Sequence, residues 1–166
     1  KNQQNILLVI HDFLKKEMND NEIDFVKLET HETHDIGDNH VNGLLTVIWR
    51  DWDKIIPNSP KMIYLSSVNP HEIKGPHLHT KRNSYFVCIK GKVVFIIKDS
   101  NGKYHEIISS ENEPNLVQIP KNFPSAHINL TNEESTILAL ADVSWKPNDQ
   151  EMENIDFDNY NWKKWE

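Results

Sequence analysis

The sequence has very little cysteine and no excess of positive charge. Cys88 is the single cysteine among 166 residues, so no internal disulfide bond can form, and we expect a cytoplasmic, reducing environment. Lys and Arg total 18 against 25 Asp and Glu, which gives a formal net charge of -7. Because nucleic-acid-binding surfaces are normally basic, we expect no nucleic-acid partner.

Long hydrophobic runs are also missing. The longest ones, such as Ile6 to Ile10 and Val93 to Ile97, are far shorter than the roughly 20 residues that span a bilayer, so we expect no membrane partner. The polar start has no small-residue cleavage site, which argues against a signal peptide. The chain has no visible repeat, and its length suits one domain with a core of its own.

What the sequence does contain is one helical pattern followed by many short strand patterns. Apolar residues recur at helical spacing between Ile6 and Leu14, which predicts an amphipathic helix over residues 4–18. Roughly nine strand-like segments follow at intervals of about 8–12 residues, which is typical of an all-β sandwich or barrel. Lys90-Gly91 and Ser100-Asn101-Gly102 indicate hairpin turns. The predicted strands are 23–28, 44–49, 62–68, 85–89, 92–98, 104–109, 116–119, 126–130 and 136–141.

This pattern divides the chain into an N-terminal helical extension (1–22), a barrel (23–145) and a C-terminal tail (146–166). The tail is polar but carries Tyr160, Trp162 and Trp165, so we expect it to be ordered and to pack on the barrel. The predicted strands around residues 93–97 and 137–141 are apolar on both faces, whereas a barrel has one inside. Their outer faces therefore need a cover, either the helix and tail or a second subunit.

Three histidines mark the candidate site. His77 and His79 are two residues apart, so in a strand both imidazoles point to the same face, where an all-β fold keeps its cavity. A neutral imidazole accepts a proton near pH 7, which favours proton abstraction next to a ketone. His127 or Lys74 could then face the oxygen of the resulting enolate. The less favoured alternative is a set of core histidines with satisfied nitrogens.

Three imidazoles could instead bind zinc, iron or manganese. The stretch after His79 contains no carboxylate up to Tyr85, and Lys81 and Arg82 add positive charge there. We therefore expect neither a metal nor another cofactor.

The remaining reactive side chains give weaker signals. Cys88 reads as a small strand residue that could still line the cavity, because it shares strand parity with Phe86. His31, His34 and His40 lie in a polar stretch with several carboxylates, which favours a solvated loop.

Several motifs, taken in order, resemble the RmlC-like cupin family, the sugar-nucleotide enzymes around dTDP-4-dehydrorhamnose 3,5-epimerase and the dTDP-4-keto-6-deoxyhexose 3,4-ketoisomerases. The resemblance runs from Gly75 to Trp162, and residues 42–49 resemble the early strand of the family. The matching pieces are His77-Leu78-His79, residues 85–93, residues 113–120, the position of His127, and Asn159-Tyr160-Asn161-Trp162.

The resemblance implies a cupin-type β-barrel (jelly roll), a metal-free homodimer, and a substrate that is a dTDP-linked 4-keto-6-deoxy sugar used in glycan precursor synthesis. It implies the role of base for His77 or His79 and contact with the sugar or its oxyanion for His127. It also implies that Lys74, Lys81 or Arg82 meets the enolate oxygen or a phosphate, and Cys88 joins these as a candidate substrate contact.

The chain departs from the epimerases at one position that matters. Their reprotonating tyrosine belongs on a strand that here reads Ile137 to Asp142 and contains none, so Tyr85 is the alternative acid. The His-x-His arrangement of the ketoisomerases does match His77 and His79, and the choice between the two reactions stays open. A metal-dependent cupin of oxygenase type and a non-catalytic sugar-nucleotide-binding module are the two other hypotheses. Trp49, Trp52 and Tyr64 are candidates for stacking on a base.

Overall fold

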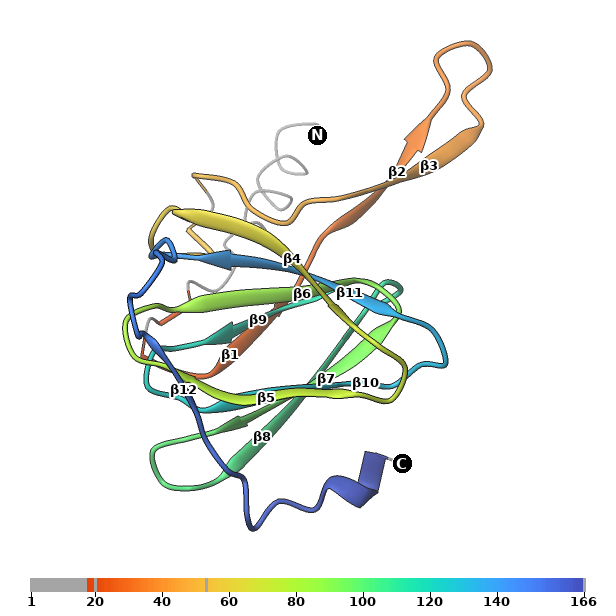
Figure 1. Ribbon diagram of the computed structural model, residues 1–166. Coiled ribbons are helices and arrows are strands. Elements are labelled where there is room, and N and C mark those ends of the chain that lie inside the picture. Colours follow the sequence, from red (N-terminus) through yellow and green to blue (C-terminus); the bar gives the residue numbers. More distant parts are fainter. Residues whose placement is uncertain (1–17, 20, 53, 166) are drawn as a thin grey trace, which may run out of the picture.

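The computed structural model describes residues 18–19, 21–52 and 54–165. Within them, two five-stranded antiparallel sheets face each other, and a two-stranded arm projects from one end (Figure 1). The elements are β1 (Asp24–Lys27), β2 (Thr30–His34), β3 (Val41–Thr46), β4 (Met62–Val68), β5 (Ile73–His79), β6 (Ser84–Lys90), β7 (Lys92–Lys98), β8 (Tyr104–Ser110), β9 (Asn115–Ile119), β10 (Ser125–Asn129), β11 (Ser135–Ala141), β12 (Met152–Asn154) and the 3-10 helix η1 (Trp162–Trp165). The first sheet has the order β1-β9-β6-β11-β4, the second has the order β12-β5-β10-β7-β8, and the arm is β2-β3.

The predicted all-β class is confirmed, and β4 and β7 coincide with the predicted ranges 62–68 and 92–98. The predicted barrel, however, is not closed by hydrogen bonds, because the described strands of the body pair within two separate sheets. The structure is therefore an open sandwich. Most of the helix predicted over residues 4–18 lies outside the described residues.

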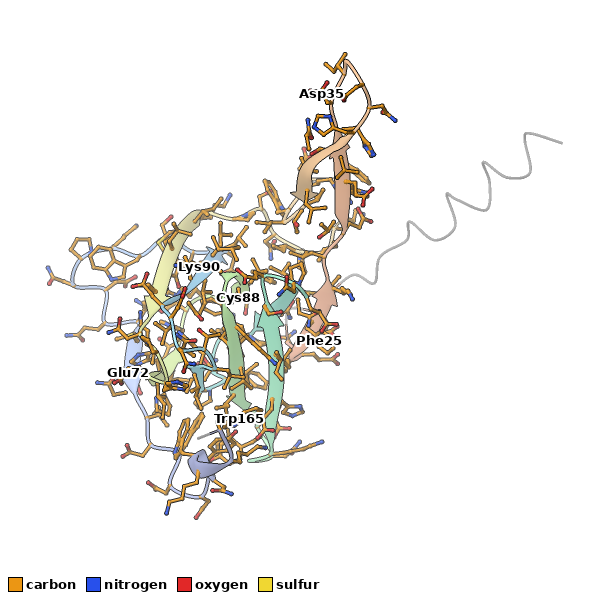
Figure 2. The ribbon with its side chains drawn as sticks, turned by 90° about the vertical axis from the view of Figure 1, so that its right-hand side faces the viewer. Phe25, Asp35, Glu72, Cys88, Lys90 and Trp165 are labelled. Carbon is orange, nitrogen blue, oxygen red and sulfur yellow. The ribbon has the colours of Figure 1, made fainter. Side chains whose placement is uncertain are left out.

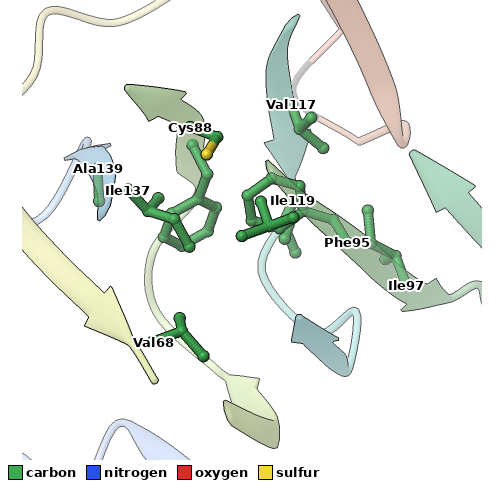
Figure 3. Close-up of a cluster of buried hydrophobic side chains, with 10 residues drawn as sticks. Val68, Cys88, Phe95, Ile97, Val117, Ile119, Ile137 and Ala139 are labelled. Carbon is green, nitrogen blue, oxygen red and sulfur yellow. The ribbon is translucent and has the colours of Figure 1, made fainter. Parts of the chain in front are cut away.

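The main core lies between the two sheets. Alternate residues of β6, β7, β9 and β11 point inward and bury their side chains completely or nearly so, as Figure 3 shows for Phe95, Val117 and Ile137. Cys88 belongs to the same cluster. Because side chains in a strand alternate, the neighbouring residues of these strands face outward and need a second cover.

Two different segments provide that cover. On the second sheet, the outward residues Val94 and Ile96 pack against Phe157 and Tyr160 of the tail, which runs beneath this sheet in Figure 1. On the first sheet, apolar side chains from outside the strands cover β6, β9 and β11; they are Met18, Leu28, Ile48, Trp49, Ile55 and Ile56. The chain thus covers much of both outer faces with its own segments.

The arm corrects one prediction. The stretch containing His31 and His34 was expected to be a solvated loop, but it forms β2, which pairs with β3. All five side chains of β2 are polar, so the sequence shows no alternation of apolar and polar residues that would predict a strand. Figure 2 shows Asp35 at the far end of the arm, away from the body. No helix in the described residues is long and apolar enough to cross a membrane.

Gly91 and Gly102 close the two predicted hairpin turns with positive φ angles of 78° and 81°. A side chain at Gly91 would overlap with the Ser135 hydroxyl, whereas at Gly102 the nearest atom is 4.0 Å away. We expect Gly102→Ala to cost about 1–2 kcal/mol of unfolding free energy, since only the left-handed backbone is penalised.

Gly91→Ala should cost clearly more than Gly102→Ala, because it adds an overlap to the same backbone penalty. Urea unfolding of both variants measures the difference. Equal costs would show that the turn shifts freely and that the contact with Ser135 does not constrain it.

Candidate active site

A cavity of about 200 Å³ opens between the two sheets, on the side where β4 and β12 form the sheet edges. Most of the side chains around it are polar, in contrast to the dry core beside it. Its lining is Tyr64, Ser66, Lys74, His77, His79, Arg82, Phe86, Ile119, Ser125, His127 and Met152.

Strand pairing brings the predicted histidines together. As expected from their spacing, His77 and His79 of β5 line the same cavity. On one side β10 pairs with β5, which sets His127 opposite Lys74. On the other side β12 sets Met152 opposite His79 and Asn154 opposite His77. The three-stranded group β10-β5-β12 therefore supplies most of the polar groups of the site.

His77 has one nitrogen bound and one available. Its Nδ1–H donates to the amide oxygen of Asn154 at 3.0 Å. In a neutral imidazole this leaves the lone pair on Nε2. No side chain of the described residues forms a hydrogen bond with that Nε2. His77 is thus positioned to accept a proton inside the cavity.

His79 has both nitrogens engaged. Its Nδ1–H donates to the carboxylate of Glu151, with both oxygens at 3.1 Å, and its Nε2 accepts from Nη2 of Arg82 at 3.2 Å. Burial and the guanidinium of Arg82 lower the pKa of His79, and Glu151 opposes them. His79 is therefore neutral at pH 7, with a proton on Nδ1.

The end of the cavity near β10 carries a cation and a third imidazole. Lys74 Nζ donates to the Ser66 hydroxyl at 2.7 Å and to the Ser67 carbonyl at 3.2 Å. His127 packs on Phe95, with ring centroids 5.6 Å apart, and its buried Nε2 has no hydrogen-bond partner in the described structure. Burial lowers the pKa of His127 to about 3, and Lys74 acts in the same direction. A neutral His127 with an unsatisfied nitrogen suits a polar ligand such as a sugar hydroxyl.

Tyr64 lines the cavity, although the sequence analysis assigned it no part in proton transfer. It lies on β4 opposite Ala139 of β11, the strand on which the resemblance places the missing tyrosine. The guanidinium carbon of Arg82 lies 5.9 Å from the centre of its ring. Burial raises the pKa of Tyr64, so the phenol keeps its proton and can donate it. The inward parity that Tyr64 shares with Ser66 is the sequence signal that could have found it.

Glu151 and Asn154 were also missed, because both lie in the tail. Each contacts one histidine from more than 70 residues away in the sequence. The aromatic residues predicted that the tail packs on the body, but nothing in the sequence indicates which tail residues reach β5.

Tyr85 lies apart from the histidines. It is completely buried on the opposite face of β6 from Phe86, in the cluster that contains Ile55 and Ile56. Adjacent strand residues point to opposite faces, so Phe86 reaches the cavity and Tyr85 does not.

Cys88 and Lys81 are not part of the cavity lining either. Cys88 is buried in the main core, its thiol donates to the Lys90 carbonyl, and burial raises its pKa to about 11, so it stays protonated. Lys81 forms an ion pair with Asp149 of the tail.

The cavity offers no assembled metal site among the described residues. Within residues 18–165, apart from the gaps, the one group of three ligand side chains within 4.8 Å of one another is Asp35, Asp38 and His40 at the tip of the arm. In the cavity, neutral His79 has no lone pair left for a metal, because Arg82 already donates to its Nε2.

Comparison with known proteins places the chain in a family. The family model described as FdtA: WxcM-like, C-terminal, matches residues 26–162. The chain belongs to this family. The resemblance seen in its motifs is thereby confirmed. A comparison with curated proteins finds no match.

Solved structures similar to this WxcM-like chain share its fold. A dTDP sugar isomerase from Desulfovibrio desulfuricans G20 has a TM-score of 0.68 at 16% identity, over 84% of this chain and 90% of that one. QdtA, a sugar 3,4-ketoisomerase from Thermoanaerobacterium thermosaccharolyticum in complex with TDP, has a TM-score of 0.62 at 18% identity, over 86% and 90%. Capsular polysaccharide assembling protein CapF from Staphylococcus aureus has a TM-score of 0.55 at 20% identity over 60% of this chain, which spans 30% of the CapF chain.

We expect Glu151→Gln to lower the pKa of His79 further, because the carboxylate is the group that opposes Arg82 and burial. Histidine NMR titration measures this directly. Glu153→Gln, a change at an exposed residue of the adjoining strand β12, is the matched control and should leave the pKa of His79 where it is. A pKa of His79 that is unchanged in Glu151→Gln would contradict the contact.

Proposed function

We propose that the protein is an isomerase of nucleotide-linked 4-keto-6-deoxy sugars, with 3,4-ketoisomerisation as its reaction. The observation that carries this proposal is the pair of imidazoles on one strand face, His77 and His79, each held at Nδ1 by a hydrogen bond to a tail residue. The family supports it, as does the shared fold with a protein named a sugar 3,4-ketoisomerase.

In this mechanism, Nε2 of His77 takes the proton from C3 of the sugar. The electron pair of the broken C–H bond forms a C3–C4 double bond, and negative charge moves onto the oxygen of C4. Lys74 is the cation that can stabilise this oxygen, and the phenol of Tyr64 can give it a proton. Because Lys74 and Tyr64 are already in place, no side chain has to move when negative charge develops on the C4 oxygen.

The second half returns a proton to C4 and takes one from the hydroxyl of C3, which becomes the new carbonyl. No proton is gained or lost overall, so the enzyme needs groups that can both accept and donate. Neutral imidazoles have this property near pH 7. Because both imidazoles lie on the same strand face, transfers on one face of the sugar are favoured, which suits ketoisomerisation better than double epimerisation.

The cavity is large enough for the sugar of the substrate but not for its nucleotide. Pockets that enclose drug-sized ligands measure about 300–1,000 Å³, whereas this cavity holds about 200 Å³. It suits a sugar ring, so the diphosphate and the base, here taken as dTDP, must lie at its mouth. Arg82 is the cation of the lining placed beside His79 to meet a phosphate.

We also propose a homodimer, with the arm as its interface. Leu44 and Leu45 of the arm are 71% and 52% exposed. An apolar groove of about 430 Å³ lies at the base of the arm, lined by residues such as Trp49, Ile63 and Leu138. A two-fold-related second copy could bury both surfaces at once, because each copy offers an arm and a groove.

We also propose that the protein is cytoplasmic and acts in glycan precursor synthesis. The buried single cysteine suits the cytoplasm. Glycan precursor synthesis is supported by the fold shared with a capsular polysaccharide assembling protein.

The reaction is tested by proton NMR in heavy water with dTDP-4-keto-6-deoxyglucose. We expect loss of the C3 signal alone, followed by appearance of the 3-keto isomer. His77→Asn should lower the rate by about 10²–10⁴-fold, the usual contribution of a general base. His71→Asn, a change at a histidine outside the cavity, should leave the rate unchanged.

Exchange at both C3 and C5 would replace ketoisomerisation with 3,5-epimerisation. Tight binding of dTDP with no exchange from any 4-keto sugar would favour the non-catalytic binding module instead.

For the dimer, Leu45→Glu should convert the protein to monomer in sedimentation equilibrium, because it places a charge in the proposed contact. Ile108→Glu, at a partly exposed apolar position on β8, should remain dimeric. A wild-type monomer at all accessible concentrations would remove this part of the proposal.

A further inference from the structure

Arg82 occupies the one nitrogen at which His79 could accept a proton. Because Nδ1–H of His79 points to Glu151, the lone pair of the neutral ring is on Nε2. Nη2 of Arg82 donates to that Nε2 at 3.2 Å. In this arrangement His79 cannot act as a base, although it lies in the same cavity as His77.

Arg82 does not use all of its hydrogen-bond donors, and its ion pair is weak. The side chain is only 10% exposed, yet its buried Nε has no hydrogen-bond partner in the described structure. Its ion pair with Glu151 is long, at 3.4 Å between Nη1 and Oε1. A guanidinium carries five N–H donors, and a buried cation with unused donors indicates a site for an anion.

We propose that the diphosphate of the bound nucleotide sugar draws Arg82 away from His79 and so frees Nε2 for proton transfer. This inference rests on the proposed function and deepens it. A guanidinium binds phosphate oxygens through two parallel hydrogen bonds, a stronger arrangement than one bond to a neutral imidazole. The diphosphate thus selects the conformation in which the second imidazole is active.

The charges around His79 suit this exchange. The titratable groups that act on it are Arg82, Glu151 and His77. When Arg82 turns to the phosphate, Glu151 stays bound to Nδ1 and becomes the counter-ion for the imidazolium that forms after proton uptake. His77 needs no such release, since Asn154 holds only its Nδ1.

The consequence is selectivity for nucleotide-linked sugars. A free keto sugar could enter the cavity and meet His77, but the second proton-transfer group would remain masked. The diphosphate would then contribute to catalysis as well as to binding.

The test is ¹⁵N NMR of histidine-labelled protein with dTDP, and with thymidine as the probe that lacks phosphate. With saturating dTDP, Nε2 of His79 should lose its hydrogen bond from Arg82, seen as a downfield ¹⁵N shift, and its pKa should rise. Thymidine should change neither. No substrate turnover is needed for this measurement.

Arg82→Gln gives the decisive comparison. In this variant the pKa of His79 should already be raised without ligand, and dTDP should raise it less than in the wild type. Its affinity for dTDP should fall about tenfold or more, since a hydrogen bond to a charged group is lost. Arg50→Gln, a change at the other arginine of the chain, is the matched control and should behave as the wild type.

The outcomes separate the two proposals. If dTDP binds to the wild type and the Arg82–His79 hydrogen bond persists, this inference is overturned while the proposed function stands. An equal rise of the pKa of His79 in the wild type and in Arg82→Gln would overturn it as well, because the phosphate charge alone would then explain the effect. If dTDP does not bind at all, the nucleotide part of the proposed function fails, and this inference fails with it.

Discussion

The pairing of β12 with β5 is the constraint on which the site depends. This three-residue strand sets Asn154 opposite His77 and carries Glu151 to His79. Without these two partners, His77 would lose the hydrogen bond that fixes its tautomer, and His79 would keep only the one from Arg82. The tail that carries β12 is held at its far end by Glu106 of β8, which accepts a hydrogen bond from Tyr160 and pairs with Lys164. One segment therefore covers the second sheet and positions the histidines.

The two buried charges beside His79, Arg82 and Glu151, affect both the stability of the fold and the pKa of the ring. Glu151 is 5% exposed and Arg82 is 8% exposed, so neither charge is well solvated, and each compensates the other through a direct ion pair and through the imidazole that both contact. Removing one partner of a buried pair typically costs about 3–5 kcal/mol, because the other charge stays behind unpaired. Burial and Arg82 lower the pKa of His79, so the same buried Arg82 affects both the stability of the fold and the protonation of the ring.

The sequence predicts this fold better than it predicts the site, for a physical reason. Strand patterns are local, and alternation located eight of the ten strands of the two sheets but neither β5 nor β12. The spacing of His77 and His79 still placed both on one strand face. The arm strand β2 was not predicted because it has no apolar face. Glu151 and Asn154 contact the histidines because β12 pairs with β5, a pairing between distant segments that alternation does not encode. Tyr85 shows the converse: it was the alternative acid because residues 137–142 contain no tyrosine, yet it points to the opposite face of β6 from the cavity.

Alternation in β4 connects the site to the proposed dimer. Tyr64 and Ser66 of this edge strand line the cavity, whereas Ile63 and Leu65, which alternate with them, face outward and are 59% and 63% exposed. An edge strand has hydrogen-bonded support on one side only, here from β11. A second copy that covers Ile63 and Leu65 would therefore also restrain the strand that carries the phenol. Because successive side chains of β4 point to opposite faces, a second copy that contacts the outer face could stabilise the site without any of its side chains entering the cavity.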